Sequence, residues 1–184
     1  MPMYPYRSSR ILLLLVCLLA FSKTQAQEFA IYDSLPQLIS RIQQAGNSTL
    51  VLNFWATWCK PCVEELPCFE ELRRQYADKN VQVLLVSLDF KSQMEKKLIP
   101  FLKAQQLKSD VILFADQDAN TWIPRIHEKW DGAIPVTLIY KGDVKAISHG
   151  KFDDYADLEK FVLPYIGDSP NISLKNLVNC NSGK

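Results

Sequence analysis

Two cysteines separated by two residues lie where a strand-like run meets a helix-like run, and this junction restricts the possible folds more than any other feature. Residues 49–55 are short and mostly apolar, as expected of a buried strand. From Cys62 onward, apolar side chains recur at intervals of three and four, which places them on one face of a helix. We therefore expect Cys59 and Cys62 at the N-terminal end of a helix that follows directly on a buried strand.

This position favours redox chemistry. The first turn of a helix has unpaired backbone N–H groups and a partial positive charge, and both stabilise a thiolate. Lys60 adds a positive charge, and Pro61 fits the first helical turn, where its missing N–H costs nothing. We expect Cys59 to act as the nucleophile and Cys62, one turn further into the helix, as the less exposed resolving cysteine.

The rest of the chain alternates between strand and helix patterns. Helices are predicted for residues 35–42, around 94–105 with an interruption at Pro100, near 122–126, and for 155–165. Strands are predicted for residues 81–88, 111–115, 136–140 and 144–148, the last two joined as a hairpin by Lys141-Gly142-Asp143. This order predicts an α/β fold, with a parallel sheet flanked by helices and the hairpin as an antiparallel edge.

The first residues are typical of an export signal. Arg7 and Arg10 precede eleven apolar residues, and Thr24-Gln25-Ala26 resembles a cleavage site. Eleven residues are too few to span a bilayer, which takes about twenty. We predict a signal peptide at 1–26, a domain at 27–166 and a loose tail at 167–184.

Composition narrows the function classes. The chain has 184 residues, 48% of them apolar and 22% charged, which suits one globular domain. The net charge is +1, and removal of the signal takes away three basic residues and no acid, which leaves −2. Because basic residues do not cluster, we expect no nucleic-acid partner.

Residues 53–62, followed by Glu65-Leu66-Pro67, resemble the active-site segment of the TlpA/ResA-like branch of the thioredoxin superfamily. The likeness covers about residues 30–166. It implies a thioredoxin-like fold with an extra helix between the second and third predicted strands, in residues 91–110. That helix either selects partners or only packs against the domain, and both interpretations remain open.

The resemblance also implies roles for single residues. Pro135 matches a cis-proline loop that faces the dithiol, and the backbone of Ile134 would hold a substrate peptide by strand-like hydrogen bonds. Glu65 would handle protons and tune the cysteine pKa, unless it is an ordinary surface glutamate. Asn53 stands where cytosolic thioredoxins usually have a buried acid. Trp58 either shields the nucleophile or is a packed aromatic side chain.

The implied activity is reduction of disulfides in exported proteins, with the Cys59–Cys62 disulfide as the redox centre and no further cofactor. The resemblance suggests periplasmic thiols, including apocytochrome c, as clients and a membrane dithiol protein as electron donor. We expect a monomer in the periplasm, attached to the membrane if the signal is retained. The direction depends on reduction potential, so an oxidase or an isomerase remains an alternative.

Two further classes are less well supported by the residues. A Cu(I) chaperone of the same fold would use thiolate ligands, but neither His127 nor His149 is spaced to complete such a site. A thiol peroxidase would need a threonine and arginine pocket around its cysteine. Cys68 is expected either to be a small buried apolar residue or to pair with Cys180, and a four-ligand zinc site would need a second cysteine pair.

Overall fold

The computed structural model describes residues 29–167, whose strands form one six-stranded sheet in the order β1-β4-β3-β2-β5-β6. The strands are β1 (Ala30–Tyr32), β2 (Thr49–Trp55), β3 (Val81–Ser87), β4 (Asp110–Phe114), β5 (Val136–Lys141) and β6 (Val144–His149). The first four in sheet order are parallel, whereas β5 is antiparallel to β2 and β6 to β5. The predicted mixed α/β sheet is confirmed.

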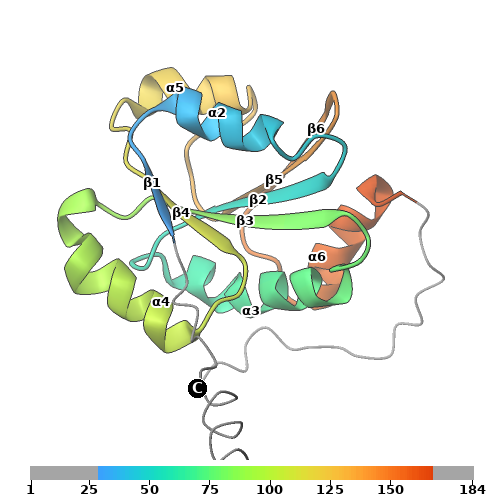
Figure 1. The fold of residues 1–184 in the computed structure, drawn as a ribbon, viewed down its shortest axis with the longest axis horizontal. Helices are drawn as coiled ribbons and strands as arrows, with labels where there is room; N and C mark the ends of the chain where they lie inside the picture. Colours follow the sequence, from blue (N-terminus) through green and yellow to red (C-terminus); the bar gives the residue numbers. More distant parts are fainter. Residues whose placement is uncertain (1–28, 168–184) are drawn as a thin grey trace, which may run out of the picture.

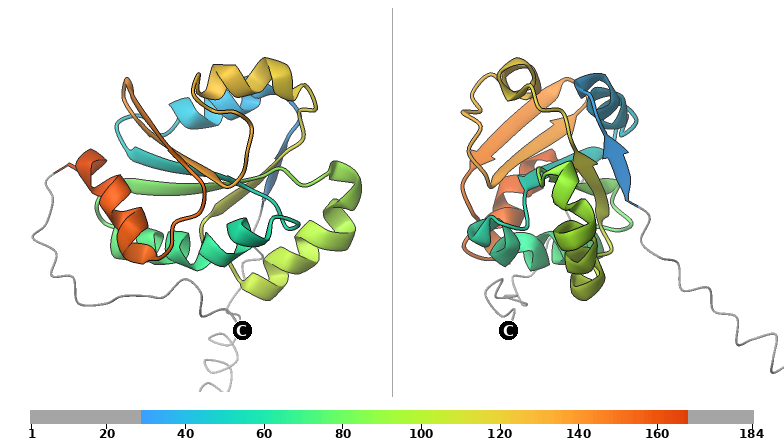
Figure 2. Two further views of the ribbon diagram at one scale, coloured as in Figure 1. Left: turned by 180° about the vertical axis from the view of Figure 1, so that it is seen from behind. Right: turned by 90° about the vertical axis from the view of Figure 1, so that its left-hand side faces the viewer.

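Helices cover both faces of the sheet (Figures 1 and 2). They are α2 (Leu35–Gln43), α3 (Lys60–Gln75), α4 (Ile99–Gln105), α5 (Ala119–Ile126) and α6 (Tyr155–Val162). Helices α2 and α5 lie on one face, while α3, α4 and α6 lie on the other. The arrangement is a three-layer α/β/α sandwich.

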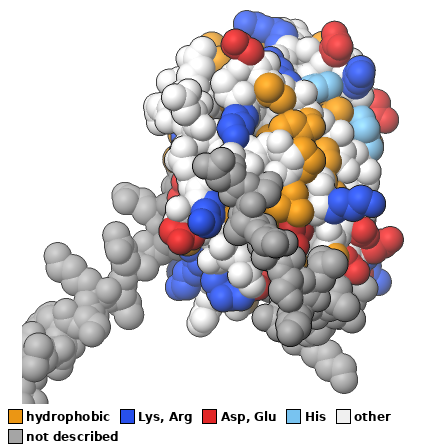
Figure 3. Space-filling view, turned by 90° about the vertical axis from the view of Figure 1, so that its right-hand side faces the viewer, with side chains coloured by type: hydrophobic (Ala, Val, Ile, Leu, Met, Phe, Trp, Pro, Cys, Tyr) orange, Lys and Arg blue, Asp and Glu red, His pale blue; other side chains and the backbone are white. Residues whose placement is uncertain are grey.

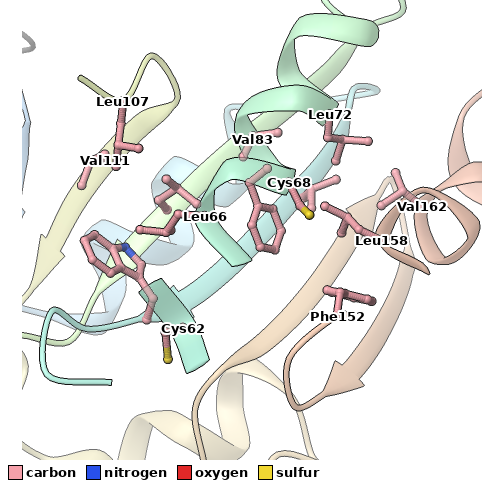
Figure 4. Close-up of a cluster of buried hydrophobic side chains, with 14 of the residues drawn as sticks. Cys62, Leu66, Cys68, Leu72, Val83, Leu107, Val111, Phe152, Leu158 and Val162 are labelled. Carbon is pink, nitrogen blue, oxygen red and sulfur yellow. The ribbon is translucent and has the colours of Figure 1, made fainter. Parts of the chain in front are cut away.

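Strand β2 is apolar along its length because both of its faces are covered. Leu50, Leu52 and Phe54 belong to the core beneath α2 and α5, and the alternate residues Val51 and Trp55 belong to the core beneath α3. Alternation of side chains along a strand produces this division. Figure 4 shows the core on the α3 side, with Cys62 at its edge and Cys68 further along the helix.

The extra helix between the second and third predicted strands is confirmed as α4, which lies between β3 and β4. It is preceded by a 3₁₀ turn (Lys91–Gln93) and a π-helical turn (Met94–Leu98). Pro100 lies in the first turn of α4, where its missing N–H is tolerated. The predicted interruption at Pro100 therefore marks a helix start inside one longer helical segment.

The last described part of the chain holds the helix α3 at both ends. Near the N-terminal end, the backbone N–H of Phe152 donates to Glu65 Oε2 at 3.1 Å. At the other end, the hydroxyls of Tyr76 and Tyr155 both donate to Glu159 Oε1 at 2.9 Å. Burial raises the pKa of both tyrosines, so these hydroxyls remain donors.

The strand β1 was not predicted, because three residues are too few to show a period of two. Its pairing with β4 forms it, in the register Ala30 to Ile112 through Tyr32 to Phe114. The predicted signal peptide and all but the first residue of the predicted tail lie outside the described residues. Within residues 29–167, the helices are too short or too polar to cross a membrane.

Candidate active site

Cys59 and Cys62 form a disulfide at the N-terminal end of α3, with their Cα atoms 5.3 Å apart. Cys59 is the residue that caps the helix and is 7% exposed, whereas Cys62 lies in the first turn and is fully buried. The right-hand view of Figure 2 looks onto the side at which this end of the helix lies. Of the two sulfurs, that of Cys59 is therefore the one that a partner can reach.

The first turn of α3 provides the expected positive environment. The helix begins at Lys60, and Pro61 follows in its first turn. Both side chains are exposed, and Lys60 Nζ lies 3.9 Å from a carboxylate oxygen of Glu64. The unpaired N–H groups of this turn and the lysine charge act on the cysteines together, and both favour a thiolate over a thiol.

The loop before β5 faces the disulfide. The Ile134–Pro135 peptide bond is cis, as the resemblance implied. The Ile134 carbonyl oxygen lies 3.8 Å from Cys59 Sγ, and the Ile134 side chain is half-buried. The backbone of this loop is thus placed beside the accessible sulfur.

Glu65 is fully buried, so the interpretation as an ordinary surface glutamate is wrong. Burial raises its pKa from 4.5 to about 7, although the Phe152 N–H, the Asn53 amide and the charge of Lys151 each act to lower it. Residues three apart on a helix are neighbours, so Glu65 lies one helical turn from Cys62. A carboxyl with a pKa near 7 can both take up and release a proton at neutral pH.

Asn53 holds the Glu65 side chain from the strand β2. Its amide nitrogen donates to Glu65 Oε1 at 2.9 Å and to the hydroxyl of Thr137 on β5 at 3.1 Å. Both Asn53 and Thr137 are fully buried. The buried acid of this site therefore comes from α3, and β2 contributes its hydrogen-bonding partner.

The tryptophans separate into two groups. Trp58, immediately before Cys59, is 56% exposed, which contradicts its interpretation as a buried packing residue. Trp122 and Trp130 are each 4% exposed and pack with Phe54 in the core on the α2 and α5 side. Of these three tryptophans, Trp58 is thus the one that lies next to the disulfide and is exposed to solvent.

The remaining candidate ligands do not gather into a metal site. Among residues 29–167, no three side chains of the His, Cys, Asp and Glu types are arranged to hold a metal ion. Cys68 is fully buried, and Figure 4 shows its sulfur towards Leu158 of α6. Cys180 lies outside the described residues, so the pairing of these two cysteines stays a prediction.

Comparison with known proteins agrees with this geometry. The family model described as AhpC/TSA family matches residues 23–146. The chain belongs to the AhpC/TSA family. The predicted resemblance to thioredoxin-like thiol–disulfide oxidoreductases is confirmed by the relatives that carry this name.

Two similar proteins illustrate the relationship. The chain is 36% identical over 89 residues to the thioredoxin-like protein YneN of Bacillus subtilis, covering 48% of this chain and 51% of that protein. It is 32% identical over 123 residues to the thiol-disulfide oxidoreductase ResA of Bacillus cereus, covering 67% of this chain and 65% of that one. The chain thus spans about half to two thirds of the length of these relatives.

A solved structure supports the fold. A thiol:disulfide interchange protein of the thioredoxin family from Chlorobium tepidum superposes with a TM-score of 0.55 at 20% identity. The superposition covers 67% of this chain and 83% of that one. At this identity, the likeness concerns the fold alone, and it confirms the predicted thioredoxin-like architecture.

One site residue of this family member was missed by the sequence analysis. Asp89 follows β3, is 3% exposed, and accepts hydrogen bonds from the backbone N–H of Thr57 at 3.0 Å and from its hydroxyl at 2.5 Å. It also accepts from the Ser87 hydroxyl at 2.8 Å. Asp89 therefore fastens the loop that leads from β2 to Cys59. The sequence did contain one indication of this role, because Asp89 is an acidic residue directly after the predicted buried strand 81–88.

Replacement of Asp89 by alanine should lower the free energy of unfolding by about 2–4 kcal/mol, because the partly buried donors of Thr57 and the buried Ser87 hydroxyl lose their acceptor. Asp89→Asn keeps an acceptor oxygen and should cost less. Urea denaturation of both oxidised variants at pH 7 measures the difference. Equal stability of Asp89→Ala and the parent protein would show that this carboxylate does not hold the loop.

Proposed function

We propose that this protein is an exported thiol–disulfide oxidoreductase that reduces disulfides of periplasmic proteins. The observation that supports this proposal most strongly is the Cys59–Cys62 disulfide at a helix N-terminus, with the accessible sulfur beside a cis-proline loop. The relatives named thiol-disulfide oxidoreductases support the same reaction class.

The proposed reaction begins with the reduced protein. The Cys59 thiolate attacks one sulfur of a substrate disulfide, which forms a mixed disulfide and releases the other substrate sulfur as a thiolate that takes up a proton. Cys62 then loses its proton and attacks Cys59 Sγ, which releases the second substrate thiol and forms the Cys59–Cys62 disulfide. The substrate gains two electrons and the protein loses two.

Glu65 suits the proton transfers in this scheme. Its carboxyl is buried one helical turn from Cys62, and its pKa of about 7 allows both protonation states in neutral solution. We assign it the uptake of the Cys62 proton when the mixed disulfide is resolved. Trp58, Lys60 and Pro61 complete the surroundings of the nucleophile, and the Ile134 and Pro135 loop would pair with the substrate main chain.

Partners and location follow from the proposed reaction. A reductase that works outside the cytoplasm needs a dithiol donor at the membrane, because it must be reduced again after each turnover. Exported proteins with disulfides, with apocytochrome c as one candidate, are the proposed clients. The signal-like residues 1–26 support export, with membrane attachment if they are retained.

The reduction potential of the Cys59–Cys62 pair tests the direction. Residues 27–184 equilibrated with glutathione or dithiothreitol buffers should give a strongly reducing value, near the thioredoxin end of the scale at about −270 mV. Alkylation of free thiols followed by mass spectrometry measures the reduced fraction in each buffer.

Other values would favour the alternatives. A potential near about −120 mV would identify an oxidant of substrate thiols, or an isomerase if the protein also rearranges disulfides. The absence of a reversible two-electron couple would contradict the redox function and would make Cu(I) binding by the same thiolates the next candidate.

A further inference from the structure

Three large hydrophobic side chains of the described residues are well exposed to solvent, and two of them follow strands that end on the side of the sheet from which Cys59 continues. They are Trp58 at 56%, Phe90 at 66% and Val144 at 48%. Trp58 follows β2 and Phe90 follows β3, whereas Val144 begins β6 in the hairpin at the far edge of the sheet. Exposed apolar side chains that lie together on a surface indicate a binding site, so the relative positions of Trp58 and Phe90 decide whether they form one.

The two aromatic residues follow neighbouring parallel strands at matching positions. Trp55 of β2 pairs with Ser87 of β3, and the backbone N–H of Leu88 donates to the Trp55 carbonyl at 2.8 Å. Trp58 and Phe90 each come three residues after this last pair. Neighbouring strands lie about 4.8 Å apart. The backbones at Trp58 and Phe90 are therefore adjacent, provided that the two loops after the strands remain side by side.

Asp89 keeps the loops together. Its two carboxylate oxygens accept the N–H and the hydroxyl of Thr57, at 3.0 and 2.5 Å, which joins the residue before Trp58 to the residue before Phe90. Because Asp89 is buried and its neighbour Phe90 is exposed, the loop turns its polar side chain inward and its aromatic one outward. The contacts between Asp89 and Thr57 thus hold Phe90 in its exposed position, and they also position the loop that leads from β2 to Cys59.

A hollow of about 410 Å³ lies beside Phe90. Phe90 and Lys91 form part of its wall, together with Phe114 at the end of β4 and Trp122 of α5. Asp89, Asp116 and Gln117 also line it, so the wall is partly polar. Its size suits one large side chain. The hollow lies at the carboxyl ends of the strands β3 and β4, the edge of the sheet from which Cys59 also follows β2.

We propose that Phe90 forms, with Trp58 and this hollow, a docking surface for an unfolded polypeptide segment that carries the substrate disulfide. The proposal rests on the oxidoreductase function proposed above and names its substrate class. A chain whose sulfur reaches Cys59 would place its main chain beside Ile134 and a bulky apolar side chain against Phe90. Because folded proteins bury most of their large apolar side chains, unfolded segments offer such groups to this surface.

Exposed apolar atoms alone would not support this assignment. Figure 3 shows the side of the molecule towards which the C-terminal end of α3 points, and hydrophobic side chains reach the surface there too. That side lies away from the N-terminal end of α3, where the disulfide is located. Its apolar groups are therefore not beside the reacting sulfurs. Val144, exposed but at the hairpin, provides a matched control for Phe90.

The first test compares two substrates. The specificity ratio is kcat/KM for a denatured disulfide-containing protein divided by kcat/KM for oxidised glutathione, with dithiothreitol as the reductant. Phe90→Ser should lower this ratio about tenfold, because the variant loses the binding free energy that comes from partly burying one aromatic side chain against the substrate. Phe90→Leu should restore most of the ratio, and Val144→Ser should leave it unchanged. An unchanged ratio in Phe90→Ser would overturn the proposal.

The second test needs no redox activity. A peptide with serine in place of cysteine and a neighbouring tryptophan is titrated into the oxidised protein, and binding is measured calorimetrically. Phe90→Ser should weaken its binding about tenfold, and replacement of the peptide tryptophan by serine should remove the difference between the two proteins. Binding that depends on Phe90 in a protein that reduces no disulfide would refute the proposed function and leave the docking surface in place. Binding that does not depend on Phe90 would overturn the docking surface, whatever the activity.

Discussion

Cys59→Ser is expected to lose disulfide reduction by more than about 10³-fold, while Cys62→Ser is expected to stop at the mixed disulfide. Serine at position 59 removes the accessible nucleophile. Serine at position 62 leaves Cys59 able to attack, but the buried sulfur that would release the substrate is missing. With a denatured disulfide protein as substrate, non-reducing electrophoresis and mass spectrometry should show an adduct in Cys62→Ser that dithiothreitol removes.

The two variants control for each other, because they change the same pair of atoms in the same turn of α3. Both variants lose the disulfide, so both should lose a similar amount of stability. A difference in the amount of mixed-disulfide adduct therefore reports the roles of the two sulfurs. If Cys59→Ser forms the adduct and Cys62→Ser does not, the assignment of nucleophile and resolving cysteine is reversed.

Glu65→Gln is expected to gain up to about 3 kcal/mol of stability relative to the parent protein between pH 4 and pH 8. Glutamine has one acceptor oxygen where the carboxyl accepts from both Asn53 and Phe152, so this gain adds to a loss of stability that is present at both pH values. Between pH 4.5 and about 7, the unfolded chain ionises Glu65 while the folded protein keeps its proton. The folded state then binds more protons, so its stability falls as the pH rises through this range. The loss is complete above pH 7, and one pKa unit corresponds to about 1.4 kcal/mol.

Urea denaturation of the oxidised protein at several pH values measures this effect. Glu64→Gln is the matched control, because Glu64 is the preceding residue and forms partly exposed ion pairs with Lys60 and Lys151. Such pairs contribute about 0–1 kcal/mol, so this variant should show a small change. A stability difference between Glu65→Gln and the parent protein that does not change with pH would contradict the raised pKa.

The helix that carries the dithiol could be predicted from the sequence, because its signals are local. A period of three to four residues, a preceding apolar strand and Pro61 near the helix start all lie within thirty residues. The cis bond before Pro135 was predicted from the resemblance and is confirmed. The position of Glu65 on the apolar face, three residues after Cys62 and four before Phe69, is consistent with the burial that the structure shows.

The contacts that hold the site could not be predicted, because they join residues far apart in the sequence. Asp89 and Thr57 are separated by 32 residues, and Phe152 and Glu65 by 87. Neither pair has a local pattern, since a backbone N–H that binds a carboxylate leaves no trace in the identity of its residue. The strand β1 was missed for a related reason: its conformation depends on pairing with β4, about eighty residues later.

The attachment of both ends of α3 to the segment that follows β6 has a consequence for biosynthesis. A ribosome completes Cys59 and Cys62 long before it adds Phe152, which lies 87 residues after its partner Glu65. Until that segment has emerged, Glu65 lacks its backbone donor, and Tyr76 lacks Glu159, 83 residues later. A growing chain therefore contains both thiols before the contacts that hold the ends of α3 can form. The oxidoreductase site is assembled only when almost the whole domain is available to fold.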